Sequence, residues 1–373
     1  MRAKDSVDAP GNITIMDFMR QILLLALYAF LSYGWGFEPF DSKPYLTPTA
    51  APTNSVFINW NTESYESTIV AFGLTAALED TVRIDGVRYH HHVLLDGLDA
   101  GTEYFYRVLP NHDIKKFATF PEYTDTVSFV VFGDTRGDSI VHQSVIDRIA
   151  TRDIDFLVHT GDLVLDGDDT NNWRTFFNVE DTLLQHTLLI PALGNHEKPY
   201  WPYDTLFALP DSEFFYSVRY GNVMFIILNS ESDIDGFQKE WLACRLAAVR
   251  EDETTDWLFV VFHRPAYSAG RYGDRTHIRE AWSSLFEQYD VDIAFAGHDH
   301  NYQRTEEING VIYVISGGGS AVLYDVEDRD WLACGEAAYH FCLVQIHGIR
   351  MTLQVIKPDG TVFDMLVKEK AGK

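Results

Sequence analysis

The most constraining feature of this sequence is a set of five short apolar segments that each run directly into side chains able to bind metal. The segments are 129–132, 156–160, 188–193, 258–262 and 293–296, and they lead to Gly133-Asp134, Gly161-Asp162, Gly194-Asn195-His196, His263 and Gly297-His298-Asp299-His300. These short apolar segments alternate along the chain with stretches whose apolar residues have helical spacing. This pattern predicts the buried strands of an α/β domain. Because ligands of an open α/β sheet gather at the carboxyl ends of its strands, we expect these side chains to converge.

The chemistry of these side chains indicates a site for two metal ions. Carboxylate, amide and imidazole groups together suit borderline or hard ions such as Fe, Mn or Zn. A shared carboxylate can hold two such ions about 3.5–4 Å apart. Each motif alone is weak evidence, since a single histidine is usually a structural one. Five motifs, each directly after a strand, strongly favour a dinuclear metal centre over a chance occurrence of structural residues.

The remaining pattern divides the chain into regions. The proline-rich stretch 38–55 is typical of a linker. Residues 56–121 contain only short alternating segments, which predict a small antiparallel β-sandwich. Helical spacing recurs at 141–149, 237–249 and 278–289, and strand-like segments return at 311–319 and 341–369. We therefore expect an all-β domain over 38–122 and an α/β (α+β) domain over 123–373.

The N-terminal region, residues 1–37, contains one apolar run, Ile22 to Leu31. Its ten residues are too few to span a bilayer but suit the apolar core of a signal peptide. A core helix is the alternative interpretation of this run. No clean small-residue cleavage site follows it, so an uncleaved membrane anchor also stays open. We expect an extracytoplasmic protein, either secreted or anchored.

Charge and cysteine content exclude two other classes. The formal net charge is −26, which argues against nucleic-acid binding because a phosphate backbone needs a basic face. It does not exclude a phosphorylated substrate, because bound metal ions reverse the local sign of charge. Three cysteines are too few for a disulfide framework, although Cys334 and Cys342 can pair in an oxidising compartment.

Taken together, the motifs resemble the five sequence blocks of the calcineurin-like metallophosphoesterases. The blocks are GD at 133–134, GDLV at 161–164, GNHE at 194–197, VVFH at 260–263 and GHDH at 297–300. The VVFH form, FHRPAY, GHDHNYQRT and the upstream all-β region resemble the purple acid phosphatase branch. The resemblance implies a four-layer-type β-sandwich flanked by helices, preceded by a small fibronectin type III-like sandwich.

The same resemblance implies roles for individual residues. Asp134 and His300 would bind the first metal ion, and Asp162 would bridge both ions. The ligands of the second ion would be Asn195, His263 and His298. The role of His196 would be that of a general acid or phosphate contact, while a metal-bound hydroxide attacks phosphorus.

Two positions depart from the family patterns. Generic members have a histidine two residues after the first aspartate, where this chain has Arg136. Purple acid phosphatases have a tyrosine where this chain has Leu165. The first ion is therefore left with three identified protein ligands. Because an arginine cannot ligate a metal but can bind phosphate oxygens as a fork, we expect Arg136 to contact the substrate. An outward salt bridge to Asp138 is the alternative.

Several other features are ambiguous. Arg264, Tyr302 and Arg304 flank ligand blocks and are candidate substrate contacts, with structural roles equally open. His90 and His92 share one strand face, but a structural role is favoured over metal binding. The glycine-rich stretch 316–320 lacks the lysine of a phosphate-binding loop and is better interpreted as a bend. Asp166, Asp168 and Asp169 are expected to form a solvated turn.

We therefore expect a metal-dependent phosphoric ester hydrolase acting on a small-molecule phosphate monoester. A phosphodiesterase acting on nucleotides or lipid headgroups is the first alternative. A surface-binding protein with a degenerate phosphatase domain is an alternative of another class, and retention of all five blocks argues against it. Nothing in the sequence specifies the oligomeric state.

Overall fold

The computed structural model describes residues 37–110 and 112–371. The predicted signal peptide or anchor, including Ile22–Leu31, lies outside the described residues. Among the helices that are described, none combines the length and apolar character needed to cross a bilayer.

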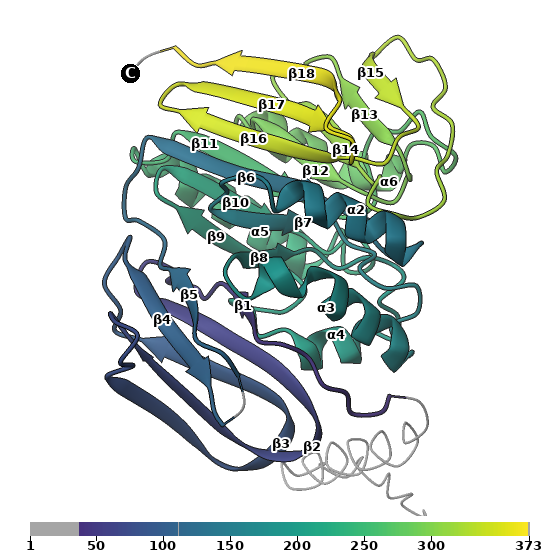
Figure 1. The fold of residues 1–373 in the computed structure, drawn as a ribbon. Helices are drawn as coiled ribbons and strands as arrows, with labels where there is room; N and C mark the ends of the chain where they lie inside the picture. The colour runs from purple at the N-terminus through teal and green to yellow at the C-terminus, as the bar shows by residue number, and fades with distance from the viewer. Residues whose placement is uncertain (1–36, 111, 372–373) are drawn as a thin grey trace, which may run out of the picture. The chain divides into compact units, whose positions relative to one another are not determined.

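The described residues between 38 and 122 form strands and no helix, as expected (Figure 1). The strands are β1 (Tyr45–Thr47), β2 (Ser55–Gly73), β3 (Asp80–Asp96), β4 (Glu103–Val108) and β5 (Lys115–Ala118). The sequence analysis divided β2 and β3 into shorter strands. Each is instead one long strand of a hairpin, whose register shifts between Asn61 and Glu66. Bulges of this kind bend a strand without ending it, so polar residues in its middle do not mark a turn.

The predicted linker at 38–55 is a further correction. It contains β1, which pairs with β2 on one side and with a strand of the α/β region, β8, on the other, through Leu46 and Leu188. Phe40 and Tyr45 are fully buried, and their rings contact Phe177. Aromatic residues between the prolines thus fix this segment against the α/β region.

Two sheets form the core of the α/β region. The first contains β6 (Thr126–Phe132), β7 (Phe156–His159), β8 (Leu188–Pro191), β16 (Phe341–His347), β17 (Arg350–Ile356) and β18 (Val362–Glu369). Its order is β18-β17-β16-β6-β7-β8, and it continues through β1 into the N-terminal strands. The β6, β7 and β8 strands are parallel to one another, so their carboxyl ends lie at the same edge.

The second sheet has the order β15-β13-β14-β12-β11-β10-β9. Its strands are β9 (Tyr216–Tyr220), β10 (Val223–Ile227), β11 (Trp257–Val261), β12 (Ile293–Ala296), β13 (Tyr302–Thr305), β14 (Ile312–Ser316) and β15 (Leu332–Glu336). The central strands β10, β11, β12 and β14 are parallel. Their residues are almost all buried, as expected for strands covered on both faces.

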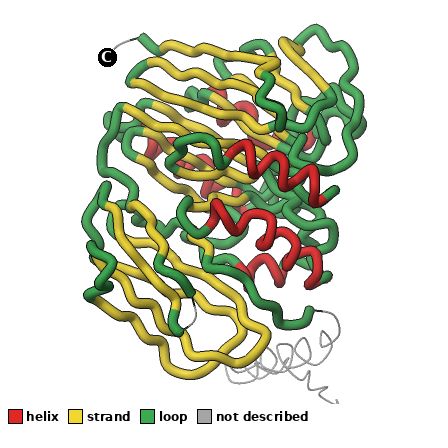
Figure 2. Tube along the Cα trace, in the orientation of Figure 1, coloured by secondary structure: helices red, strands yellow, loops and turns green. Residues whose placement is uncertain are grey.

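Helices cover the outer faces of both sheets (Figure 2). They are α2 (Ser139–Ile149), α3 (Thr170–Leu184), α4 (Trp201–Leu206), α5 (Phe237–Glu251), α6 (Thr276–Ile278), the π-helical turn η1 (Arg279–Ser283) and α7 (Ser284–Gln288). The sequence analysis predicted α2, α5 and the α6–α7 segment, but neither α3 nor the short α4. Of these two, α3 is the longer. It buries Trp173, Phe176 and Phe177. This helix–sheet–sheet–helix order is the four-layer arrangement expected.

Aromatic side chains fill the space between the two sheets. The Phe129 ring of β6 lies 5.0 Å from that of Phe225 in β10 and 5.6 Å from that of Phe259 in β11. Phe156 of β7 also contacts Phe225, at 5.2 Å. These contacts between fully buried rings hold the sheets face to face, which fixes the strand ends of one sheet against those of the other.

Candidate metal centre

The predicted ligands all follow strands at one edge of the two sheets. Asp134, Asp162 and Asn195 come after the parallel strands β6, β7 and β8. His263 follows β11, and His298 and His300 follow β12. Asp134, Asp162 and the three histidines are buried, and Asn195 is partly buried. Parallel pairing therefore brings together side chains that are up to 166 positions apart in the sequence.

Donor atoms at this edge form two groups that share one carboxylate. The oxygen of Asp162 and nitrogens of His263 and His298 lie within 4.8 Å of one another, and so do donor atoms of Asp134, Asp162 and His300. Asn195 joins the first group, since its Oδ1 is 3.3 Å from His263 Nε2. The structure thus brings the six predicted ligands together, and Asp162 is common to both groups.

Glycines allow the ligand loops to approach this closely. A Cβ atom on Gly194 would lie 2.4 Å from Asp162 Oδ1, and one on Gly161 would lie 2.8 Å from His263 Nδ1. Asp134, Asp162 and His298 themselves adopt positive φ angles of 57°, 56° and 71°. Such backbone strain in non-glycine residues concentrates at functional sites.

Backbone carbonyls orient two of the histidine ligands. His263 Nδ1 donates to the carbonyl of Thr160 at 2.9 Å, and His300 Nδ1 donates to that of Val322 at 2.7 Å. This fixes the tautomer that leaves each Nε2 facing the site, as is typical of metal-bound histidines. Burial, with a contribution from Arg136, lowers the pKa of His300 to about 4, so its ring is neutral at pH 7.

The two carboxylates fit a bound cation. Asp134 is fully buried, and its Oδ1 has no hydrogen-bond partner among the described residues. Burial raises the pKa of Asp134, although His263 and Arg136 oppose the rise. Although burial opposes it, His263 lowers the pKa of Asp162. A buried carboxylate oxygen without a hydrogen-bond partner, beside imidazole nitrogens, is a donor set that metal ions complete.

Glu197 is a site residue that the sequence analysis did not single out, although it belongs to the GNHE block. Its buried carboxylate accepts the backbone N–H groups of Asp162, Val164 and Gly194, at 3.1, 3.2 and 2.7 Å. It therefore ties the second ligand loop to the third. The signal in the sequence was an acid directly after the asparagine and histidine of that block.

Arg136 points into the metal centre. Its Nε is 3.0 Å from Asp162 Oδ2, and its Nη2 is 3.0 Å from His300 Nε2. Asp138, the alternative partner, instead caps α2 by accepting from the backbone of Ile140 and Val141. The guanidinium thus contacts donor atoms of the first metal position.

His196 lies at the exposed side of the centre. Its Nδ1 donates to the carbonyl of Leu165 at 2.6 Å, and its Nε2 is 3.9 Å from Asp162 Oδ2. The side chain is 29% exposed, so part of it is accessible to an incoming molecule. The Leu165 backbone positions His196, whereas the Leu165 side chain is exposed.

The other predicted substrate contacts separate into two cases. Arg264 lies at the centre, with its Nη1 3.0 Å from His298 Nε2 and its Nε 2.9 Å from Glu231. Tyr302, in contrast, is fully buried and donates to Asp364 of β18 at 2.6 Å, and Arg304 pairs with the same carboxylate. Tyr302 is therefore corrected to a structural residue, because β13 alternation turns its side chain away from the ligands.

Three ambiguous features have structural partners. His90 and His92 bond to the Oδ1 atoms of Asn61 and Asn59 across the β2–β3 hairpin, each at 2.7 Å. The 316–320 stretch packs under the first ligand loop, where Gly319 N donates to the carbonyl of Gly133 at 2.9 Å. Cys334 in β15 and Cys342 in β16 are both free thiols.

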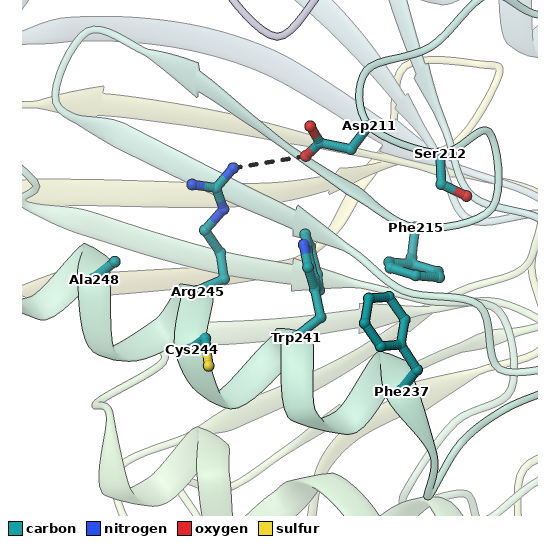
Figure 3. Close-up of a pocket in the computed structure, with 8 residues that line it drawn as sticks. All are labelled: Asp211, Ser212, Phe215, Phe237, Trp241, Cys244, Arg245 and Ala248. Carbon is teal, nitrogen blue, oxygen red and sulfur yellow. Dashed lines mark ion pairs between the residues drawn. The ribbon is translucent and has the colours of Figure 1, made fainter.

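A surface pocket of about 540 Å³ lies beside α5, lined by Phe215, Phe237 and Trp241 (Figure 3). Arg245 and Asp211 form an ion pair at its edge, at 3.6 Å. The predicted site residues are not among those that line it. The pocket is therefore separate from the metal centre.

The paired sheets place carboxylate, amide and imidazole donors around one shared aspartate, an arrangement suited to binding two metal ions. Comparison with known families agrees. Residues 127–302 match the calcineurin-like phosphoesterase family, and residues 42–130 match the N-terminal domain of purple acid phosphatases. The chain belongs to the calcineurin-like metallophosphoesterases that carry a purple acid phosphatase N-terminal domain.

The individual relatives have low sequence identity to this chain. Phosphoenolpyruvate phosphatase from Allium cepa is 28% identical over 275 residues, covering 66% of this chain and 57% of that protein. Purple acid phosphatase 22 from Arabidopsis thaliana is 30% identical over 237 residues, covering 58% and 54%. The chain thus spans less than two thirds of the length of these relatives. A purple acid phosphatase from yellow lupin seeds has the same fold, with a TM-score of 0.79 at 21% identity over 89% of this chain and 74% of the lupin chain.

Proposed function

We propose that this protein hydrolyses phosphate monoesters with the help of two metal ions. The observation that carries the proposal is the pair of donor groups sharing Asp162. Asp134, Asp162 and His300 would hold the first ion, and Asp162, Asn195, His263 and His298 the second. Fe, Mn and Zn match this mixture of oxygen and nitrogen donors. Bound there, two such ions would polarise the phosphoryl group and supply a nucleophile from water.

His196 is positioned to protonate the leaving group. Because the Leu165 carbonyl fixes the proton on Nδ1, Nε2 is the atom that exchanges a proton with substrate. That atom lies 3.9 Å from Asp162 Oδ2, on a side chain that is 29% exposed. When the bond between phosphorus and the ester oxygen breaks, the alcohol part of a monoester leaves as an alkoxide or phenoxide. A proton donor at this place neutralises that oxygen as the bond breaks.

Arginines at the centre would orient the phosphoryl oxygens. Arg136 and Arg264 each bring a guanidinium to the Nε2 atom of a proposed ligand histidine. Guanidinium N–H groups match the geometry of phosphate oxygens and stabilise the charge that develops during transfer. This local positive charge is what an otherwise acidic protein needs to bind an anionic substrate.

The names of the plant relatives support monoesters as the substrate class. The test is to load the purified full chain with Fe, Mn or Zn and compare hydrolysis of p-nitrophenyl phosphate with that of its bis ester. We expect faster turnover of the monoester, and loss of activity with a chelator. Preference for the bis ester would instead indicate a phosphodiesterase, and absence of metal-dependent turnover would indicate a binding protein.

The proposal includes an extracytoplasmic location, supported by the Ile22–Leu31 run. Cell fractionation of the full-length chain tests this point separately. Recovery in a secreted or membrane fraction is expected, and recovery only in the cytosol would contradict it.

A further inference from the structure

Two tyrosines stack directly on ligand histidines at the metal centre. The ring of Tyr272 lies 4.5 Å from that of His298 at an interplanar angle of 27°, and the ring of Tyr324 lies 4.3 Å from that of His300 at 21°. The two hydroxyl oxygens are 3.5 Å apart. One tyrosine thus covers a histidine of each metal position, and together they form a continuous aromatic wall.

The segment that carries the histidines also supports this wall. The backbone N–H of Tyr272 donates to Asp299 Oδ1 at 3.2 Å, between the two ligands in sequence. The N–H of Tyr324 donates to the carbonyl of His300 at 3.0 Å, and Asn301 Nδ2 donates to the carbonyl of Tyr324 at 3.1 Å. The wall is therefore held by the metal centre itself, which favours a role in the reaction over a loose surface contact.

Two arginines lie against the tyrosine wall. The Cζ of Arg271 is 4.8 Å from the ring centre of Tyr324 and 5.9 Å from that of Tyr272. Arg275 Cζ is also 5.9 Å from the Tyr272 ring, and its Nη2 is 3.0 Å from His298 Nε2. Cation–π contacts of this kind hold a guanidinium in place while leaving its N–H groups free to donate.

These arginines lack the carboxylate partners that neighbouring arginines have. Arg136 and Arg264 pair with Asp162 and Glu231. Among the residues that the structure describes, no salt bridge involves Arg271 or Arg275. Arg275 Nε is, moreover, buried without a hydrogen-bond partner. Buried donors are normally satisfied, and arginines without a salt bridge are unexpected in a chain with net charge −26, so the site is suited to an anion from outside.

We propose that Arg271, Arg275, Tyr272 and Tyr324 form a subsite for a second anionic group of the substrate. The inference rests on the proposed function and narrows its substrate class. Arg136 and Arg264 would hold the phosphoryl group that is transferred, the tyrosines would contact the alcohol part, and Arg271 and Arg275 would bind a carboxylate or phosphate attached to it. Such a substrate is a phosphate ester with two anionic groups a few bonds apart.

Binding of non-hydrolysable phosphonates tests the subsite without requiring turnover. The metal-loaded full chain is titrated calorimetrically with phenylphosphonate, its 3- and 4-carboxy derivatives and benzene-1,4-diphosphonate. The second anion should tighten binding by about 10- to 100-fold, the range of one or two charge-assisted hydrogen bonds. Comparison of the carboxylate and phosphonate arms shows which anion the subsite prefers.

Variants then assign the effect to the proposed residues. Arg271→Gln and Arg275→Gln should each reduce the advantage of the second anion by about tenfold. Arg350→Gln removes an exposed arginine that pairs with Glu369 in the C-terminal hairpin, and it should keep the full advantage. Circular dichroism confirms that each variant is folded.

The outcomes separate this inference from the proposed function. If no second anion improves binding to the wild-type chain, or if the advantage survives in both variants, the subsite does not exist. If the advantage is present and lost as expected while no monoester is hydrolysed, the subsite stands and the proposed activity is overturned.

Discussion

The two halves of the metal centre share Asp162 but differ in what completes them. The second half adds Asn195, His263 and His298. The first half adds only Asp134 and His300, and Arg136 contacts two of its donor groups. A cation that cannot ligate thus stands where generic family members have a histidine. The two proposed metal positions therefore differ in protein ligation and in local charge.

The second half also has guanidinium groups nearby, but they are placed differently. Arg264 and Arg275 both contact His298 Nε2, whereas, among the described residues, neither forms a hydrogen bond or salt bridge with Asp162. Of these three arginines, Arg136 is the one that contacts the shared carboxylate, at 3.0 Å. A change at Arg136 is therefore expected to alter the relative metal affinities of the two halves. A change at Asp162 should instead remove metal binding at both.

Asp162→Ala should have the largest effect. Both donor groups lose their common oxygen donor, so metal content should fall to near zero and turnover to background. Because ligands that bind only the folded state stabilise it, the rise in melting temperature that metal gives the wild type should also disappear. Elemental analysis and thermal unfolding with and without metal measure these effects.

Asp235→Ala is the matched control, since it removes an exposed aspartate that pairs only weakly with Lys239. Its metal content and turnover should equal those of the wild type. An Asp162→Ala protein that still binds two ions per chain would contradict the bridging assignment.

Most of the proposed metal ligands could be predicted from the sequence, because glycine-aspartate and histidine motifs directly follow short apolar strands. Periodicity could not show that Arg136 contacts Asp162 or that Tyr302 turns toward Asp364, since both depend on how distant strands align. The tyrosine wall was also missed. Tyr272 and Tyr324 are 52 positions apart and lie in loops, where no repeating pattern connects them.

His196→Ala should have the second largest effect, and on rate alone. The residue lies outside the two donor groups, so both metal positions should keep their ions. Loss of a proton donor should lower kcat by about 10²–10⁴-fold for an ester with a poor leaving group such as glycerol phosphate. The loss should be smaller for p-nitrophenyl phosphate, whose leaving group needs little protonation. Equal losses for both substrates, or reduced metal content, would show that His196 has another role.

Arg136→His should strengthen binding of the first metal ion and weaken binding of the substrate. The new imidazole supplies the ligand that generic family members have, so affinity for the first ion should rise. Loss of the guanidinium should raise KM for p-nitrophenyl phosphate by about tenfold, the size of a charge-assisted hydrogen bond. Metal titration of the apo protein and steady-state kinetics give the two values.

Arg136→Gln separates the two causes, because it removes the guanidinium without adding an imidazole. It should raise KM as Arg136→His does, but should not strengthen the first metal position to the same degree. Unchanged metal affinity and unchanged KM in both variants would mean that the inward contact of Arg136 has no role in either process.

The smallest expected effect is the absence of a colour. Purple acid phosphatases owe their colour to charge transfer from a tyrosinate to ferric iron, and Leu165 occupies the position of that tyrosine. Iron-loaded protein should therefore lack an intense visible band. The comparison of the two halves identifies the residue to check if a band appears. Tyr324 stacks on His300, a ligand of the first position, and is the tyrosine best placed to replace the missing one. Loss of the band in Tyr324→Phe would then show that the first position gains a fourth protein ligand from the aromatic wall, whereas its persistence would exclude Tyr324 as the source.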